Sequence, residues 1–339
     1  MTEAIFPLLG TAFVILIALP CSALIAKAGL MIVEHEKVSG RLHSLDLRYI
    51  LLIATSIVPI AWFLSAGLHQ IESGKLTLAC LFDHNAALCF EPGFFALTLI
   101  FVVIHLGTAT LRHNRRPRIS TSTHADALTQ RVERLILANA SLQPLHGRIR
   151  ITDEHDFALG THGLLKPVVI IGSSFADRIS HDMLASALAH ENEHVRSLDP
   201  LRYLLLKLAL AVNPLGRFLL GSHVSRWHAA QEAHCDREAV IRGASPLSLA
   251  DAIIRAARPS TQEAVALGAR DTTVLKFRIQ MLLAFSEQNP TRCCRREIPA
   301  IPMILILLIF TLILPHQTST AALDAIHTGS EHILTYFLH

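Results

Sequence analysis

Long uncharged stretches stand out in the pattern of hydrophobic and polar positions along this chain. No Asp, Glu, Lys or Arg occurs in residues 4–26, 49–71, 92–111 or 298–315. Because a helix that crosses a bilayer needs about 17–25 apolar residues, the pattern predicts four membrane-spanning helices. The first stretch lacks the basic start and the small-residue cleavage site of a secretory signal, so we expect it to remain as an anchor.

The basic residues between these stretches predict how the chain lies across the membrane. Lys and Arg cluster in the first connection, after the third stretch and before the fourth. The second connection has only Lys75, and neither residues 1–3 nor residues 316–339 contain a Lys or Arg. Since basic residues in short loops favour the cytoplasmic side, we expect external N- and C-termini and a cytoplasmic region 112–297.

This topology divides the chain into four parts. Residues 1–111 contain three membrane helices with their connections, and residues 298–315 form the fourth membrane helix. Between them, residues 112–297 are the one sizeable aqueous domain, long enough to bury a core of its own. Residues 316–339 remain as a short external tail.

Within the region 112–297 the hydrophobic period changes from helix to strand and back. Apolar residues at helical spacing predict an amphipathic helix over Thr123–Ala138. Alternating β-branched residues at 148–152 and the apolar run Val168–Gly172 predict strands that together form a small antiparallel sheet. A helix over His181–Ser197 follows, with Ser180 or Asp182 as its cap.

Two more helices are expected in this region. Asp199 and Pro200 are typical of an N-cap and a first helical turn, so we expect a helix over residues 201–212. Asn213 and Pro214 interrupt it, and a further helix takes in residues 227–241. The pattern as a whole predicts a mainly α membrane protein with an α+β cytoplasmic domain inserted between membrane helices three and four.

Composition supports the membrane assignment and excludes two other classes. The 339 residues are 51% hydrophobic and only 17% charged, against about 25% charged in an ordinary soluble domain. A chain this hydrophobic is not intrinsically disordered. A net charge of +3 is too small a basic excess for a nucleic-acid-binding surface, so we expect no direct nucleic-acid partner.

The cysteines add one candidate disulfide. Six cysteines in this length are too few for a disulfide scaffold. Cys80 and Cys89 lie in the second connection, where an external location permits a disulfide, and two unpaired thiols are the alternative. Cys293 and Cys294 fall on the reducing side beside basic residues, where palmitoylation and a plain juxtamembrane position both stay open.

The helix expected over His181–Ser197 contains an H-E-x-x-H pattern formed by His190, Glu191 and His194. Residues four apart share a helix face, so both imidazoles can reach one Zn²⁺ while Glu191 stands beside it. Catalytic zinc takes a third protein ligand and leaves one position open for water. Glu191 could then accept a proton from water and pass it to a leaving amine. A solvated polar helix face is the alternative.

Residues further along support the metal site. Glu232 and Asp236 lie four apart on the helix expected over 227–241. A carboxylate ligand, with a second carboxylate that orients a ligand histidine, is the expected surrounding of such a zinc ion. We therefore predict one zinc ion per chain. His228 lies on the same face and is either a substrate contact or a polar surface histidine, whereas Cys235 is expected to be a small buried hydrophobe pointing away from that face.

The motifs resemble those of the BlaR/MecR-type membrane metallopeptidases, the antirepressor family of β-lactam signalling. The resemblance covers roughly residues 1–297. Weaker matches occur at residues 163–167 and 275–279. The main motifs are His190-Glu191-x-x-His194-x4-Asp199, Asn213-Pro214-Leu215 and Glu232-Ala233-His234-Cys235-Asp236.

This resemblance implies a role for each site residue. His190, His194 and Glu232 would be the zinc ligands, Glu191 the general base and Asp236 the carboxylate that orients a ligand. The implied fold of the cytoplasmic domain is gluzincin-like, helical with a small sheet. By the same resemblance, Val168–Gly172 is expected to pair with an extended substrate.

The function implied is that of a zinc-dependent endopeptidase at the cytoplasmic face of the bacterial inner (plasma) membrane. Its substrate would be a regulatory protein such as a transcriptional repressor, an expectation that rests on the family alone. The β-lactam receptors continue after the fourth span into a penicillin-binding sensor domain. This sequence ends at His339 without a Ser-x-x-Lys site in its tail, so we expect a different inducing signal.

Two other functions fit part of the pattern. A quality-control protease of the HtpX type shares the four spans and the motif, but that family places two spans between the motif and the third ligand. Here residues 195–231 contain only the nine-residue uncharged run 208–216, too short to cross a bilayer. A signalling scaffold would result if His228 or Cys235 closed the zinc site as a fourth protein ligand. The sequence leaves the substrate, the inducing signal and the oligomeric state open.

Overall fold

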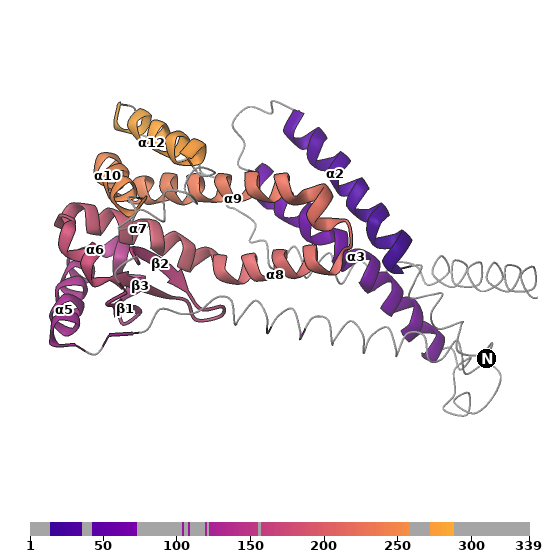
Figure 1. Cartoon of the computed structure of the whole chain (residues 1–339), viewed down its shortest axis with the longest axis horizontal. Helices are drawn as coiled ribbons and strands as arrows, with labels where there is room; N and C mark the ends of the chain where they lie inside the picture. Colours follow the sequence, from indigo (N-terminus) through magenta and orange to yellow (C-terminus); the bar gives the residue numbers. More distant parts are fainter. Residues whose placement is uncertain are drawn as a thin grey trace, which may run out of the picture. The chain divides into compact units, whose positions relative to one another are not determined.

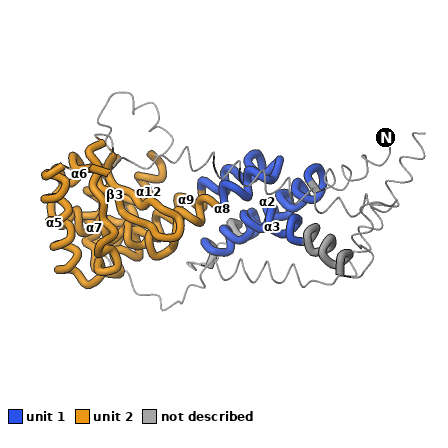
Figure 2. Tube along the Cα trace, turned by 90° about the horizontal axis from the view of Figure 1, so that it is seen from below, with its two compact units in different colours: residues 1–113, 205–225, 297–339 blue, residues 114–204, 226–296 orange. Residues whose placement is uncertain are grey.

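The architecture was analysed in a computed structural model of the chain. It describes residues 14–35, 43–72, 104, 108, 119–120, 122–154, 157–257 and 272–287. These residues are mostly helical and include a small mixed sheet (Figure 1). The chain divides into two compact units (Figure 2). The first comprises residues 1–113, 205–225 and 297–339, and the second comprises residues 114–204 and 226–296.

Two long helices pack against each other in the first unit, α2 (Leu19–His35) and α3 (His43–Glu72). A short π-helical segment, η2 (Val14–Ala18), leads into α2. Thr55 and Ser56 of α3 are buried, and the other buried side chains described in these two helices are apolar. They include Leu19, Ala23, Leu30, Leu45, Tyr49, Leu52 and Ile53.

The outer surface of α2 is also apolar. Leu16, Leu24 and Ile25 are 70%, 52% and 73% exposed, and exposed apolar side chains in such density mark a surface that another apolar phase covers. Residues Ile15–Ile32 are long and apolar enough to cross a membrane, and among the described residues they alone meet both criteria. This judgement rests on length and composition.

The predicted spans differ in how far the structure describes them. The first, 4–26, overlaps the apolar stretch Ile15–Ile32 but starts earlier, and the second, 49–71, lies within α3. All of 298–315 and nearly all of 92–111 lie outside the described residues, as do Cys80 and Cys89. The four-span topology and the disulfide therefore stay predictions.

The second unit opens with α5 (Thr123–Ala138), which has the bounds expected from its periodicity. Ser122 caps this helix, because its Oγ accepts a hydrogen bond from the backbone N–H of Ala125. The apolar face of α5 is buried, and a 3₁₀ turn, η4 (Ala140–Leu145), connects it to the sheet.

Three short strands form the sheet, in the order β1-β3-β2. They are β1 (Ile149–Thr152), β2 (Leu159–His162) and β3 (Val168–Gly172). β3 runs parallel to β1 and antiparallel to β2. The expected antiparallel sheet is therefore wrong. The chain returns through β2 before it enters β3, so β1 and β3 point the same way.

The central position of β3 overturns a second expectation. Both edges of β3 carry strands, so Val168–Gly172 has no edge left for a substrate peptide. Among the described strands, β2 has a partner on one side only. Gly172 at the end of β3 lies so close to the loop before β2 that an added Cβ would clash with the backbone oxygen of Phe157, so this position requires glycine.

A helical turn and the motif helix follow the sheet. α6 (Ser173–Arg178) is short, and α7 (His181–Ser197) has the predicted bounds. Of the two expected caps, Ser180 accepts the hydrogen bond, from the backbone N–H of Met183. Leu198 ends α7 in the left-handed conformation, with φ of 52°.

Four further helices complete the described chain. α8 (Asp199–Val212) and α9 (Gly216–Ile241) are separated at Asn213 and Pro214, as the sequence predicts, although α9 begins eleven residues before the predicted residue 227. Each of these two helices has residues in both units, because residues 205–225 group with the first unit. α10 (Pro246–Ala257) and α12 (Thr272–Glu287) follow in the second unit.

The apolar core of the second unit encloses α7. Most of its members come from α5, the sheet, α6 and α7, and they include Val132, Leu135, Ile171, Phe175 and Leu188. α10 and β2 also contact α7. As a result His190 through Val195 are all buried, so the H-E-x-x-H motif is no solvated polar face.

Candidate metal centre

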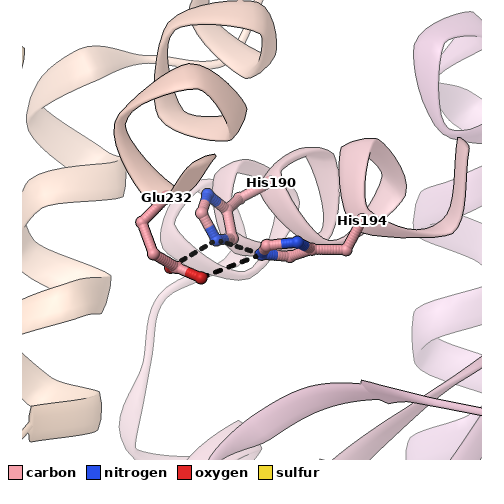
Figure 3. A group of neighbouring side chains, drawn as sticks. All are labelled: His190, His194 and Glu232. Atoms are coloured by element: carbon pink, nitrogen blue, oxygen red, sulfur yellow. Dashed lines mark hydrogen bonds and ion pairs between the residues drawn. The ribbon is translucent and has the colours of Figure 1, made fainter. Parts of the chain in front are cut away.

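α7 directs the two motif histidines to the same point. Nε2 of His190 lies 3.0 Å from Nε2 of His194, and the two rings stand at 80° to each other (Figure 3). Both side chains are buried. This arrangement follows from the helix itself, because residues four apart lie one above the other on one face.

Glu232 of α9 joins the two imidazoles. Its Oε2 lies 3.6 Å from Nε2 of His190, and its Oε1 lies 3.6 Å from Nε2 of His194 (Figure 3). Two ligand atoms held at 2.0–2.1 Å from one tetrahedral zinc ion are about 3.3 Å apart. The three observed separations bracket that value, so the group could hold a metal ion with little rearrangement.

An aspartate binds the outer nitrogen of each ring. Nδ1 of His190 lies 2.8 Å from Oδ1 of Asp236, and Nδ1 of His194 lies 2.6 Å from Oδ2 of Asp199. Because an ionised carboxylate only accepts, each Nδ1 carries the hydrogen, and each ring then offers a lone pair on Nε2 once that nitrogen is deprotonated. The two Nε2 lone pairs and the carboxylate of Glu232 would then face one point, where a cation fits between them.

The carboxylates around the two histidines favour positive charge at this point, and the pKa values of the histidines and of Glu232 shift accordingly. Burial lowers the pKa of His190, but the hydrogen bond to Asp236 and the charge of Asp236 outweigh it and raise the pKa to about 10. Burial also acts against the charged form of His194, and the hydrogen bond to Asp199 raises its pKa nevertheless. Burial would raise the pKa of Glu232, yet its contact with His190 holds that pKa well below the ordinary value.

Arg278 of α12 holds the carboxylates from the outer side. Its Nε and Nη2 donate to the two oxygens of Asp236 at 2.7 and 2.8 Å. Its Nη1 donates to Oε2 of Glu232 at 2.9 Å. Burial would raise the pKa of Asp236, but the bidentate contact with Arg278 lowers it. Arg278 therefore fixes the rotation of both carboxylates.

Glu191 connects the motif helix to the sheet. Oγ1 of Thr161, a residue of β2, donates a hydrogen bond of 2.7 Å to Oε2 of Glu191. Glu191 is only 7% exposed. The carboxylate predicted as general base is thus oriented by β2, which has one partner strand among the described strands.

Tyr203 of α8 packs against two aromatic side chains of α9. Its ring contacts those of Trp227 and His228, with centroid separations of 5.4 and 4.7 Å. The hydroxyl is buried and has no hydrogen-bond partner among the described residues. Burial, followed by the negative charge of Glu232, raises the pKa of Tyr203, so the hydroxyl keeps its proton.

Cys235 is buried as expected, but its surroundings are polar. Its Sγ lies 3.6 Å from Nδ1 of His194 and 3.9 Å from Oδ2 of Asp199. These three residues form a second group that could hold a metal ion. It shares His194 with the first group and uses the nitrogen that already binds Asp199. Burial and the charge of Asp199 raise the pKa of the thiol, which disfavours the thiolate that a metal needs.

The structure brings His190, His194 and Glu232 together and places Asp236 behind His190, and the charge of Glu191 acts on His194. His228 contacts Tyr203.

Sequence reasoning assigned no site role to Arg278, Thr161, Tyr203 or Gln231, and treated Asp199 as a helix cap and a motif position. Gln231 donates to both carboxylate oxygens of Asp199. For Asp199, the signal was its distance of five residues from His194.

No protein-family model matches this chain, and the searches of curated proteins and of solved structures found no match either. The resemblance to the BlaR/MecR-type family is therefore carried by the motifs alone. What bears on function is the geometry of the residues around His190.

Proposed function

We propose that this chain is a membrane-bound zinc-dependent endopeptidase that hydrolyses peptide bonds of a protein substrate at the cytoplasmic face. The observation that carries the proposal is the convergence of two imidazole nitrogens and one carboxylate within bonding distance of a common point, with the charge of Glu191 near enough to raise the pKa of His194. Three protein ligands leave a fourth tetrahedral position for water or substrate, the arrangement of catalytic zinc.

Each of the site residues has a proposed role in peptide-bond hydrolysis. Bound zinc supplies Lewis acidity, which polarises a substrate carbonyl and lowers the pKa of water. Glu191 takes a proton from the attacking water and delivers it to the leaving amine. Asp199 and Asp236 keep each imidazole in the tautomer whose Nε2 is free to bind a metal.

The substrate is proposed to lie along β2. An extended peptide that adds to the open edge of a strand is held by main-chain hydrogen bonds, which do not require a particular sequence. Thr161 of β2 contacts Glu191, so a peptide on this strand passes next to the general base. Tyr203 is proposed to donate its unpaired hydroxyl to the oxygen of the scissile carbonyl as negative charge develops there.

The proposal is tested by comparing the zinc-loaded wild type with Glu191→Gln in detergent, using a proteome-derived peptide library and mass spectrometry of new termini. Glu191→Gln should bind zinc as the wild type does and produce no new termini. Glu238→Gln on α9, whose partner Arg242 lies 3.7 Å away, is the matched control and should cleave normally. Equal cleavage by wild type and Glu191→Gln would remove the proposed base.

A hydroxamate inhibitor separates the peptidase from a silent scaffold. A scaffold needs a fourth protein ligand, but Cys235 faces Nδ1 of His194 rather than Nε2. We therefore expect the zinc-loaded chain to bind the hydroxamate through the open position. The peptide library also distinguishes the two proteolytic roles, because a regulatory protease gives few cleavage sites and a quality-control protease gives many.

A further inference from the structure

The tip of the α8–α9 hairpin belongs to the first unit. Residues 205–225 group with α2 and α3, whereas the zinc-binding residues before and after them group with the second unit (Figure 2). This tip has two charged residues, Lys207 and Arg217, and no acidic ones. It therefore differs in composition from the rest of the region between the motif and Glu232.

Side-chain hydrogen bonds attach the tip to both long helices of the first unit. Nδ2 of Asn213 donates to the backbone oxygen of Leu19 at 2.7 Å and to that of Thr55 at 3.3 Å. Oγ of Ser56 donates to the backbone oxygen of Ala209 at 2.6 Å. Asn213 is only 2% exposed. Leu19 is part of the apolar stretch Ile15–Ile32, so the tip contacts the candidate membrane helix itself.

The backbone N–H groups at the tip are paired within the turn. The N–H of Asn213 donates to Ala209, that of Gly216 donates to the backbone oxygen of Asn213, and Pro214 has no N–H. The N–H of Leu215 donates to Oδ1 of Asn213 at 3.2 Å. Gly216 permits this closeness, since a Cβ there would lie 2.9 Å from the oxygen of Leu210. A turn at membrane depth needs this kind of internal pairing, because lipid offers no partner.

The same tip turns apolar side chains outward. Phe218 is 86% exposed and Leu215 is 37% exposed. Leu215 lies in the turn itself and Phe218 in the first turn of α9. Both belong to the unit in which Leu16, Leu24 and Ile25 of the candidate span are also exposed. An exposed phenylalanine beside a candidate membrane span fits an acyl-chain environment rather than water.

We propose that residues 205–225 form a re-entrant hairpin that inserts into the lipid bilayer from the cytoplasmic side without crossing it. From Ile32 to Leu19 the helix rises about 20 Å at 1.5 Å per residue, so Asn213 reaches about two thirds of a hydrocarbon core of about 30 Å. The occupant of the Phe218 surface is lipid acyl chain. The inference rests on the contacts of the first unit and is independent of the proposed peptidase activity.

The test uses the full chain in nanodiscs with a bimane fluorophore on single cysteines. Cys21, Cys80, Cys89, Cys293 and Cys294 are replaced by serine, and Cys235 stays because it is buried. The probe positions are Phe218→Cys and Leu215→Cys. Ile25→Cys on α2 is the membrane control, and Leu137→Cys, 61% exposed on α5, is the aqueous control. Size-exclusion profiles verify that each variant folds.

Brominated lipids should quench the labels at 218 and 215 as strongly as the label at 25, and iodide in the buffer should quench only the label at 137. Quenching at 218 by iodide, with none by brominated lipid, would overturn the proposal while the control at 25 still reports a membrane helix. Protection from both quenchers would also overturn it, because protein instead of lipid would then cover this surface.

Discussion

At the scale of single residues, the candidate metal centre depends on a series of contacts that begins at Arg278, a residue outside the predicted site. Arg278 binds both Asp236 and Glu232, and Asp236 in turn binds His190. A carboxylate that is fixed on both sides holds its imidazole in one orientation. The metal affinity should therefore depend on a residue that touches neither histidine.

We expect Arg278→Lys to lower the affinity for zinc by about 10- to 100-fold, because an ammonium cannot reproduce the bidentate contact. Affinity is measured by competition with a chromogenic chelator. Arg255→Lys on α10 is the matched control, since its partner Asp251 lies 3.4 Å away and both are half-exposed. Equal affinities for the two variants would contradict the role of Arg278.

Thr161 supports a separate prediction, which rests on the proposed function. Thr161→Val keeps the shape of the side chain but removes the hydrogen bond to Glu191. We expect kcat for peptide cleavage to fall about 10- to 100-fold, because a general base that turns away loses its alignment with water. Zinc content should stay unchanged.

Thr129→Val on α5 serves as the control for Thr161→Val, because it removes a hydroxyl that binds only the backbone oxygen of Ala125. A loss of zinc together with the loss of kcat in Thr161→Val would show that the residue supports the ligands and not the base.

At the scale of elements, local signals determined the helices well and the sheet poorly. Ser122 and Ser180 cap α5 and α7 where the sequence predicts their starts. A cap and a hydrophobic period act within a few residues, so they can be recognised without the fold. β2 consists of Leu-Gly-Thr-His, with no β-branched run, and is held in place by its pairing with β3.

Ser180→Ala should lower the free energy of unfolding by about 1 kcal/mol, because the backbone N–H of Met183 loses its acceptor. The measurement is chemical denaturation of the full chain in detergent, followed by circular dichroism. Ser286→Ala on α12 is the control, since that hydroxyl donates to a backbone oxygen of its own helix and caps no N-terminus. An equal loss in both variants would argue against the cap.

At the scale of the whole molecule, a metal ion would couple α7 to α9. A ligand that binds only the folded state stabilises it by about 4 kcal/mol when its free concentration is 1,000 times its Kd. His190 and His194 come from α7 and Glu232 from α9, so zinc would join two separate helices.

We therefore expect a chelator such as EDTA to lower the midpoint of thermal unfolding of the zinc-loaded chain, and added zinc to restore it. His194→Ala should show a lower midpoint that neither EDTA nor zinc changes. Scanning calorimetry in detergent measures both. A midpoint of the wild type that is insensitive to EDTA would mean that the group holds no metal.

The sequence by itself determined the H-E-x-x-H helix, placed His190 and His194 on one face of it, and limited its cap to Ser180 or Asp182. Helical period and residue chemistry are local properties that can be read along a chain. Only the tertiary structure decided that β3 is central, that Arg278 and Thr161 hold the site carboxylates, and that Asn213 binds the carbonyl of Leu19. These contacts join residues far apart in sequence, and no local pattern specifies which distant groups will meet when the chain packs.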